Sequence, residues 1–173
     1  MKKWLIGIFT LLLAALIVFL ALGYFNSPMS INSKVSTTIS IDTAFSAYRN
    51  PAIIKHWMKD LDSIRLIKGL NQQAGAIYLL DINQQETSYQ MDYTLLQMQE
   101  PATMHFRLEN EALRNNISVH FTSTEAGTTV ERKEEIEGKT AFMKSALFLM
   151  RKTLEQQSKR ELERFAQYLT TNK

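Results

Sequence analysis

The sequence predicts an α+β domain in which an antiparallel sheet of about seven strands is covered by a long C-terminal helix, with one transmembrane helix in front of the domain. Three patterns in the 173 residues lead to this prediction. Residues 4–23 carry no charge, segments between 35 and 137 alternate apolar and polar side chains, and residues 140–170 place apolar side chains three or four apart. These patterns are typical of a membrane span, of half-buried strands and of an amphipathic helix, respectively.

The apolar segment at residues 4–23, WLIGIFTLLLAALIVFLALG, is long enough to cross a membrane. Twenty helical residues rise about 30 Å, which matches the hydrocarbon thickness of a bilayer. Trp4 and Tyr24 stand at its two ends, where the aromatic residues of membrane interfaces belong. We therefore expect residues 1–25 to form an N-terminal transmembrane anchor.

The residues near the two ends of this segment indicate its orientation in the membrane and whether it is cleaved. Lys2 and Lys3 favour a cytoplasmic N-terminus. This orientation predicts a single-pass protein of the cytoplasmic (inner) membrane, with its C-terminal domain on the extracytoplasmic (periplasmic) side. A cleaved signal peptide is the alternative, because Ala21 and Gly23 are small enough to precede a cleavage site. The apolar region of a signal peptide is normally only about 7–15 residues long, which favours the anchor.

The next segment predicts a linker, a strand and two short helices. Residues 26–34, NSPMSINSK, are polar and typical of a linker, so we expect the globular domain to cover 35–173. VSTTISI at 35–41 alternates as a strand does. Asp42 is a candidate N-cap for a first short helix, and Pro51 is well placed to begin a second.

The remaining chain predicts the rest of the sheet and the long helix. Further strands are expected near 63–70, 75–82, 88–98, 102–110, 115–123 and 128–137. Several of them have one apolar and one polar face, as an antiparallel sheet with a single buried side requires. The final helix, from Thr140 to about Thr170, contains no Gly or Pro. Its first half is apolar around more of its circumference, so we expect this half to contact more than the sheet.

The composition excludes several classes of function. The chain has 20 basic and 17 acidic residues, and this near balance argues against a nucleic-acid partner. The lack of cysteine excludes disulfides and thiolate chemistry. His56, His105 and His120 do not have metal-ligand spacing, and no phosphate-binding or nucleophile motif is present. We expect no metal, no cofactor and no catalytic residue, with His105 and His120 on the solvated face of the sheet.

The strand GTTVERKEEIEG at 127–138 raises the sharpest question. Alternation places Val130, Arg132, Glu134 and Ile136 on one face, so an ion-pair-like couple lies on a side that is otherwise apolar. Two interpretations stay open. Either a bulge or the open end of the sheet brings the pair to water, or Arg132 binds an anionic headgroup or carboxylate while Glu134 orients it.

Two segments resemble the START-like SRPBCC superfamily, in particular its polyketide cyclase/dehydrase and lipid transport branch. ISIDTAFSAYRNPAIIKHWMKDL at 39–61 resembles the family's first strand, paired helices and following Trp, and EAGTTVERKEEIEG at 125–138 resembles its last strand. The resemblance extends over about 35–170. It implies a helix-grip fold, in which a curved sheet and the long helix enclose a cavity open to hydrophobic ligands. It also implies that the last strand lies between the first and the sixth. It says little about chemistry, because the superfamily includes carriers, receptors and cyclases.

We therefore expect a membrane-anchored module that binds a lipid or another hydrophobic small molecule between the sheet and the C-terminal helix. The expected ligand contacts are Arg132, Glu134, Tyr89, Tyr93, Met91, Phe106, Phe121, Met143, Leu147 and Met150. Two alternatives stay open: a cyclase- or hydrolase-like enzyme that uses the same cavity, and a protein-interaction module of the cell envelope whose interior is plain core. Trp57 is expected to be a packing anchor or, alternatively, a residue of the pocket mouth.

Overall fold

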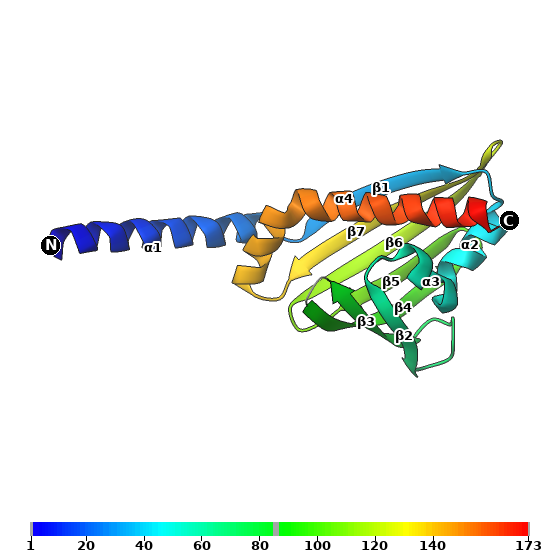
Figure 1. Ribbon diagram of the computed structural model, residues 1–173, viewed down its shortest axis with the longest axis horizontal. Helices are drawn as coiled ribbons and strands as arrows, with labels where there is room; N and C mark the ends of the chain where they lie inside the picture. Colours follow the sequence, from blue (N-terminus) through cyan, green and yellow to red (C-terminus); the bar gives the residue numbers. More distant parts are fainter. Residues whose placement is uncertain (1, 85–86, 173) are drawn as a thin grey trace.

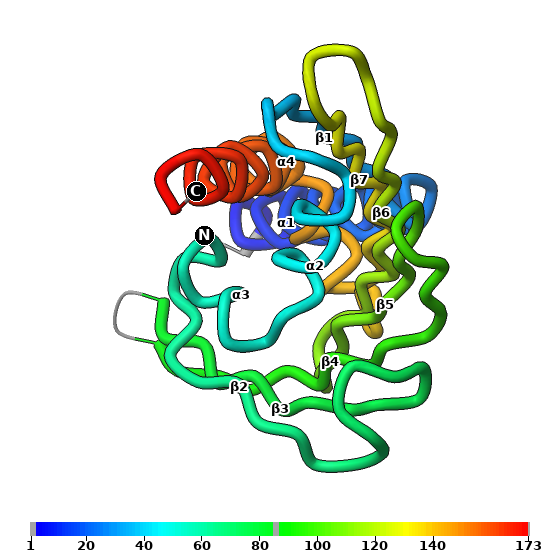
Figure 2. The backbone as a smooth tube through the Cα atoms, turned by 90° about the vertical axis from the view of Figure 1, so that its right-hand side faces the viewer, coloured from blue at the N-terminus to red at the C-terminus, as the bar shows by residue number. Residues whose placement is uncertain are grey.

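A curved seven-stranded antiparallel sheet forms the body of the protein, with helices on its concave side (Figures 1 and 2). The computed structural model describes residues 2–84 and 87–172. The strand order is β1-β7-β6-β5-β4-β3-β2. The strands are β1 (Met29–Thr37), β2 (Leu61–Lys68), β3 (Ile77–Gln84), β4 (Thr87–Gln99), β5 (Thr103–Glu109), β6 (Leu113–Thr124) and β7 (Gly127–Gly138). The helices are α1 (Lys2–Phe25), α2 (Ile41–Arg49), α3 (Pro51–Trp57) and α4 (Ala141–Thr171). The predicted α+β architecture is confirmed.

Strand β1 begins earlier than the sequence predicts. It starts at Met29, so most of the expected linker at 26–34 is strand that pairs with β7. Met29 and Ile31 are buried, and Ser33 faces the same side, where its hydroxyl lies 2.9 Å from the hydroxyl of Ser158 in α4. The polar Ser33 interrupts the apolar face, which explains why the pattern did not reveal the strand. A fragment that begins at residue 34 would lack half of β1.

The two short helices begin at polar caps. Ser40 caps α2, where its hydroxyl accepts a hydrogen bond from the Thr43 amide, so the predicted cap at Asp42 is wrong. Asp42 instead lies in the first turn, where a carboxylate favours the positive end of the helix dipole. Asn50 caps α3, and Pro51 is its first residue, as predicted.

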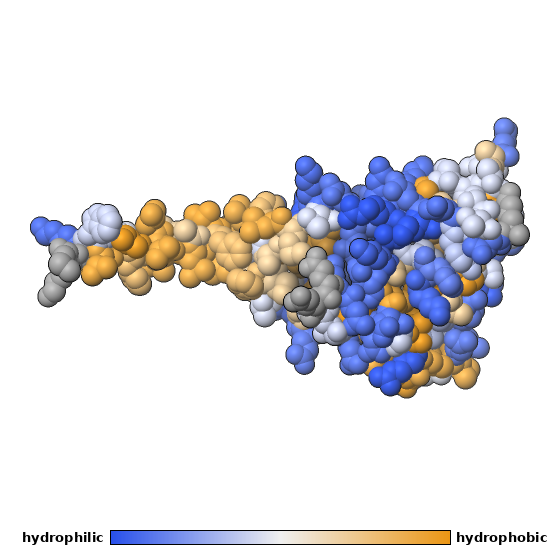
Figure 3. All heavy atoms as spheres, viewed as in Figure 1, coloured by the Kyte–Doolittle hydropathy of each residue, from blue (hydrophilic) through white to orange (hydrophobic). Residues whose placement is uncertain are grey.

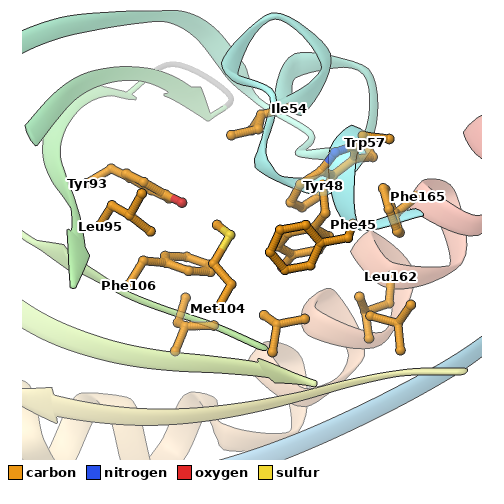
Figure 4. Packing of buried hydrophobic residues seen from close by; sticks show 14 of the residues in the cluster. Phe45, Tyr48, Ile54, Trp57, Tyr93, Leu95, Met104, Phe106, Leu162 and Phe165 are labelled. Carbon is orange, nitrogen blue, oxygen red and sulfur yellow. The ribbon is translucent and has the colours of Figure 1, made fainter. Parts of the chain in front are cut away.

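Helices α2 and α3 cover the open side of the sheet with aromatic side chains. Tyr48 stacks on Trp57 at 4.9 Å between ring centroids and meets Phe165 of α4 edge-on at 5.1 Å (Figure 4). Trp57 is almost fully buried, which makes it a packing anchor rather than a residue of a pocket mouth. Each such buried aromatic side chain contributes about 1.5–3 kcal/mol of hydrophobic stabilisation.

Helix α4 lies over β1 and β7, and its first half also contacts α1 (Figure 1). The Phe19 and Phe142 rings are 5.7 Å apart. Gly23 lies so close to Ser145 that a Cβ atom on this glycine would be 2.3 Å from the Ser145 backbone nitrogen. The expectation that this half of the helix contacts more than the sheet is therefore confirmed, and its additional partner is α1.

The buried apolar side chains form two clusters. The larger one joins the inner faces of β3 to β6 with α2, α3 and the second half of α4. The smaller one lies between β1, β7 and the first half of α4, and consists of Met29, Ile31, Ile136 and Leu147. The polar residues that separate these clusters form the centre of the candidate site.

Candidate functional site

Arg132 and Glu134 both point into the protein. Residues of β7 alternate regularly between buried and exposed, and the register of β7 with β1 and β6 is unbroken. Only 3% of Arg132 and 6% of Glu134 are exposed. The interpretation in which a bulge or an open end brings this pair to water is therefore wrong. As the resemblance implies, β7 lies between β1 and β6.

The Arg132 guanidinium joins the sheet to α4. Its Nη2 donates hydrogen bonds to the Ser158 carbonyl oxygen at 3.0 Å, to the Ser158 hydroxyl at 2.9 Å and to Glu161 Oε2 at 3.1 Å. Its Nε lies 3.0 Å from Glu134 Oε1, an ion pair whose angle falls outside hydrogen-bond geometry.

Glu134 is held from three elements. The Ser158 hydroxyl donates its single proton to Glu134 Oε1 at 2.5 Å, so this hydroxyl can only accept from Arg132 and from Ser33. The Asn115 amide of β6 donates to Glu134 Oε2 at 2.7 Å. We call the set Arg132, Glu134, Glu161, Ser158, Ser33 and Asn115 the Arg132 cluster.

The α4 members of the Arg132 cluster were not predicted from the sequence. Ser158 and Glu161 lie on the buried side of α4, between Leu154 and Leu162, where the stripe of the helix would otherwise be apolar. This interruption is the signal that was available. Two polar residues on the inner side of a helix match two polar residues on the inner side of the strand beneath it.

Burial and charge act in opposite directions on Arg132. Burial alone lowers the pKa of a guanidinium, but the nearby Glu134 and Glu161 carboxylates outweigh it and raise the pKa of Arg132 above its usual range. A buried ion pair contributes little net stability, because desolvating the charges costs about as much as their attraction returns. Removing one partner is costly, because the other charge stays buried.

The Tyr48 side chain forms the border between the Arg132 cluster and the larger apolar cluster. Its ring stacks on Trp57, and its hydroxyl is buried without a hydrogen bond of ordinary geometry to a described residue. Burial raises the pKa of Tyr48 to about 12, and the positive charge of Arg132 opposes this shift.

Four of the predicted ligand contacts lie together on the inner face of the sheet, within the larger cluster. These are Met91 and Tyr93 of β4, Phe106 of β5 and Phe121 of β6. Tyr93 stacks on Phe106 at 4.7 Å between ring centroids. Its hydroxyl points toward the space between the sheet and α2–α3, and it makes no hydrogen bond among the described residues (Figure 4).

The other predicted contacts lie elsewhere. Leu147 belongs to the smaller cluster, and Met143 packs against it, on the opposite side of the Arg132 cluster from Tyr93. Met150 and Tyr89 are exposed. The structure therefore does not bring the α4 residues and the sheet residues of the predicted set around one common space.

A surface cavity of about 460 Å³ opens between α2, α3 and the last turns of α4. Ile39, Ala47 and Leu169 supply apolar surface, and Asp42 and Asn172 are among its polar residues. The helices α2 and α3 and the end of α4, which line this cavity, lie at the end of the domain remote from α1 (Figure 1).

The histidines take no part in either region. The His105 ring lies 2.9 Å from the Ser118 hydroxyl on the outer face of the sheet, and His120 is exposed beside it. His56 stacks on Tyr168 at the surface. Within residues 2–84 and 87–172, no group of three or more His, Cys, Asp or Glu side chains is arranged to hold a metal ion.

Neither a protein-family model nor a curated protein sequence matches the chain. Similar solved structures include Ara h 8.0201, with a TM-score of 0.65 and 10% identity over 82% of this chain and 97% of that one. The di-domain ARO/CYC protein StfQ of the steffimycin biosynthetic pathway has a TM-score of 0.67 and 8% identity, over 83% of this chain and 51% of its own. Norcoclaurine synthase from Thalictrum flavum, in complex with dopamine and hydroxybenzaldehyde, has a TM-score of 0.60 and 12% identity, over 83% of this chain and 87% of its own.

These identities are too low to transfer an activity, and the likeness defines the fold. The protein has the helix-grip fold of Bet v 1-like and SRPBCC proteins, as the sequence resemblance implied. An N-terminal apolar helix precedes this fold.

The first prediction concerns the charge balance of the Arg132 cluster. Arg132→Met leaves two carboxylates in the interior without their cation, so we expect the free energy of unfolding to fall by about 3–5 kcal/mol. Urea denaturation of the full chain in detergent micelles measures this change. Replacing Arg132, Glu134 and Glu161 together by apolar residues should recover most of the loss.

The matched control is Lys133→Met, at the next residue of β7. Lys133 pairs with Glu135 at 2.9 Å on the exposed face, with about half of each side chain exposed. A surface pair of this kind contributes at most about 1 kcal/mol. Equal losses from Arg132→Met and Lys133→Met would contradict the role given to the buried cluster.

The second prediction concerns stability at high pH. The Tyr48 pKa is about 12 in the folded protein against 10.0 for a free tyrosine, so the unfolded chain loses this proton first. The unfolded state therefore binds fewer protons between these values, and stability falls as the pH rises through this window. Two pKa units correspond to about 2.7 kcal/mol. Tyr48→Phe should lose less stability than the parent between pH 9 and about 11.5. Chemical denaturation measures the free energy of unfolding at each pH. Equal losses of this free energy in the two proteins as the pH rises would contradict the prediction.

Proposed function

We propose that the protein is a membrane-anchored module that binds a lipid or another hydrophobic small molecule. The ligand lies between the inner face of β4 to β6 and helices α2 and α3. Its polar group meets the Tyr93 hydroxyl, and its apolar part contacts side chains such as Met91, Phe106 and Phe121. The physical task is to shield apolar surface from water, which requires no catalytic group.

The observation that carries this proposal is the contrast between two neighbouring tyrosines. Tyr78 and Tyr93 are paired across β3 and β4, and both are buried on the inner face. The Tyr78 hydroxyl donates to Asn71 at 2.8 Å and accepts from the Gln72 amide at 2.6 Å. The Tyr93 hydroxyl lacks such partners among the described residues and points inward (Figure 4). A hydroxyl that has no partner within the described residues is free to pair with the polar group of a ligand, and a hydrogen bond of this kind contributes about 0.5–1.5 kcal/mol.

The fold supports the same proposal by analogy. The norcoclaurine synthase structure holds two aromatic small molecules in a fold of this shape. Analogy of fold does not supply a reaction, however. The cyclase- or hydrolase-like alternative lacks an evident acid–base pair, because Arg132 and Glu134 are engaged with each other and with α4.

The membrane part of the proposal depends on α1. Residues Lys3–Phe25 have a mean hydropathy of 3.0 over the most apolar stretch, and the helix is long enough to cross a bilayer. A signal sequence would pass the same test. The close packing of Gly23 on Ser145 favours a retained helix, because cleavage would remove a fitted partner of α4. Lys2 and Lys3 favour a cytoplasmic N-terminus, and this orientation puts the proposed binding domain outside the cytoplasmic membrane.

Ligand binding is tested with a fluorescent fatty acid titrated into the full chain in micelles, together with native mass spectrometry of the purified protein. Tyr93→Phe should weaken the affinity about three- to tenfold, equivalent to about 0.7–1.4 kcal/mol. Tyr78→Phe is the matched control, because its hydroxyl is already satisfied within the protein. Its substitution should lower stability and leave affinity unchanged. Equal affinities for all three proteins, or a parent that retains and binds no hydrophobic molecule, would refute the proposal.

A further inference from the structure

The first half of α4 carries a strip of exposed apolar side chains, which consists of Phe142, Leu149 and Met150. These side chains are 64%, 67% and 50% exposed. Residues seven and eight positions apart lie on one face of an α-helix, so the three side chains form a continuous apolar strip. Large exposed apolar side chains gathered on one face mark a contact site when nothing in the fold covers them.

The strip continues the apolar surface of α1. The Phe142 ring lies 5.7 Å from the ring of Phe19, and Ser145, one turn further along α4, packs on Gly23. Figure 3 shows that hydrophobic residues cover α1 as far as its junction with the domain. The end of α1 is therefore fixed against α4 instead of leading into a free linker.

This contact sets the depth of the strip if α1 spans a bilayer, so the inference rests on the proposed anchoring. Phe19 lies six residues before Phe25, the end of α1, which corresponds to about 9 Å along the helix axis. Tyr24 and Phe25 are the aromatic residues suited to the membrane interface. Phe142, beside Phe19, would then lie below the lipid headgroups.

Basic side chains flank the strip at both of its ends. From residue 138 to residue 154 the chain contains four basic and no acidic residues. Lys139 and Lys144 lie at the start of the strip, and Arg151 and Lys152 follow its end. Three of them pair with carboxylates outside this segment: Lys139 with Glu109, Lys144 with Glu137 and Arg151 with Glu155. Ion pairs with exposed partners are weak, so these cations can exchange their carboxylates for lipid phosphates. A helix with an apolar face and flanking Lys and Arg residues is typical of segments that lie in the plane of a membrane interface.

We propose that the first three turns of α4 are a second membrane contact, with Phe142, Leu149 and Met150 among the acyl chains and the flanking basic residues at the phosphates. Two contacts, α1 and this strip, hold the domain in one orientation on the bilayer. The cavity between α2, α3 and the end of α4 then opens on the side away from the membrane.

The lack of cysteine makes a site-specific test direct. Leu149→Cys carries a polarity-sensitive fluorophore in the full chain, reconstituted in phosphatidylcholine–phosphatidylglycerol vesicles with lipids brominated at defined depths. Interfacial helices bury their apolar face about 5–10 Å into the headgroup and acyl boundary, so quenching should be strongest with shallow bromines. Lys159→Cys, an exposed position further along α4, is the control and should show no quenching.

A label at Leu12→Cys separates this inference from the anchoring on which it rests. If deep bromines quench the label at residue 12 while the label at 149 behaves like that at 159, the anchor stands and the strip is not a membrane contact. If the label at 12 is not quenched, the anchoring fails and the strip loses its basis. A label at 149 that is shielded from water but not quenched by lipid indicates a protein partner or a second copy, and this result also overturns the proposal.

Discussion

A buried guanidinium determines how this protein is put together. Arg132 lies on the inner face of a central strand, where it needs anionic partners within hydrogen-bond distance. Glu134 on the same strand supplies one, and Glu161 on α4 supplies another, with Ser158 between them. A purely apolar contact between α4 and β7 would still form if the helix were shifted by one turn along its axis. The directional hydrogen bonds from Arg132 to Ser158 and Glu161 would be lost in such a shift. The cluster therefore fixes the position of α4 more than it adds net stability.

The position of α4 divides the interior. With the helix held over β1 and β7, the inner faces of β3 to β6 are left to α2 and α3, which bring Tyr48 and Trp57. The first half of α4 packs against β1 on one side and against α1 on another. One polar cluster thus separates an aromatic region, where we propose the ligand binds, from a region that joins the domain to its N-terminal helix.

Much of this fold follows from periodicity, because each element buries one face. The strands from β3 onward, the paired short helices and α4 were predicted close to their observed positions. The start of β1 was not, because Ser33 places a hydroxyl where alternation leads one to expect an apolar side chain. The sequence pattern revealed the unusual pair Arg132 and Glu134, but it did not reveal the partners of this pair. Ser158 and Glu161 belong to a single turn of α4 in which the buried side of the helix is polar. The spacing of apolar residues identifies which face of a helix or strand is buried, but not which residues of the neighbouring elements it contacts. For the same reason, Met143 and Leu147 were assigned to a ligand site and in fact face β1.

In the proposed mode of binding, the ligand lies on the Tyr93 side of the Arg132 cluster and not along the seam between α4 and β1. Methionines report on both sides: Met91 and Met104 belong to the larger cluster, whereas Met29 and Met143 lie at the seam. Methyl NMR of the full chain, labelled at methionine and titrated with a fatty acid in micelles, distinguishes the two regions. We expect the Met91 and Met104 resonances to shift saturably while those of Met29 and Met143 stay in place. Saturable shifts confined to Met29 and Met143 would contradict it.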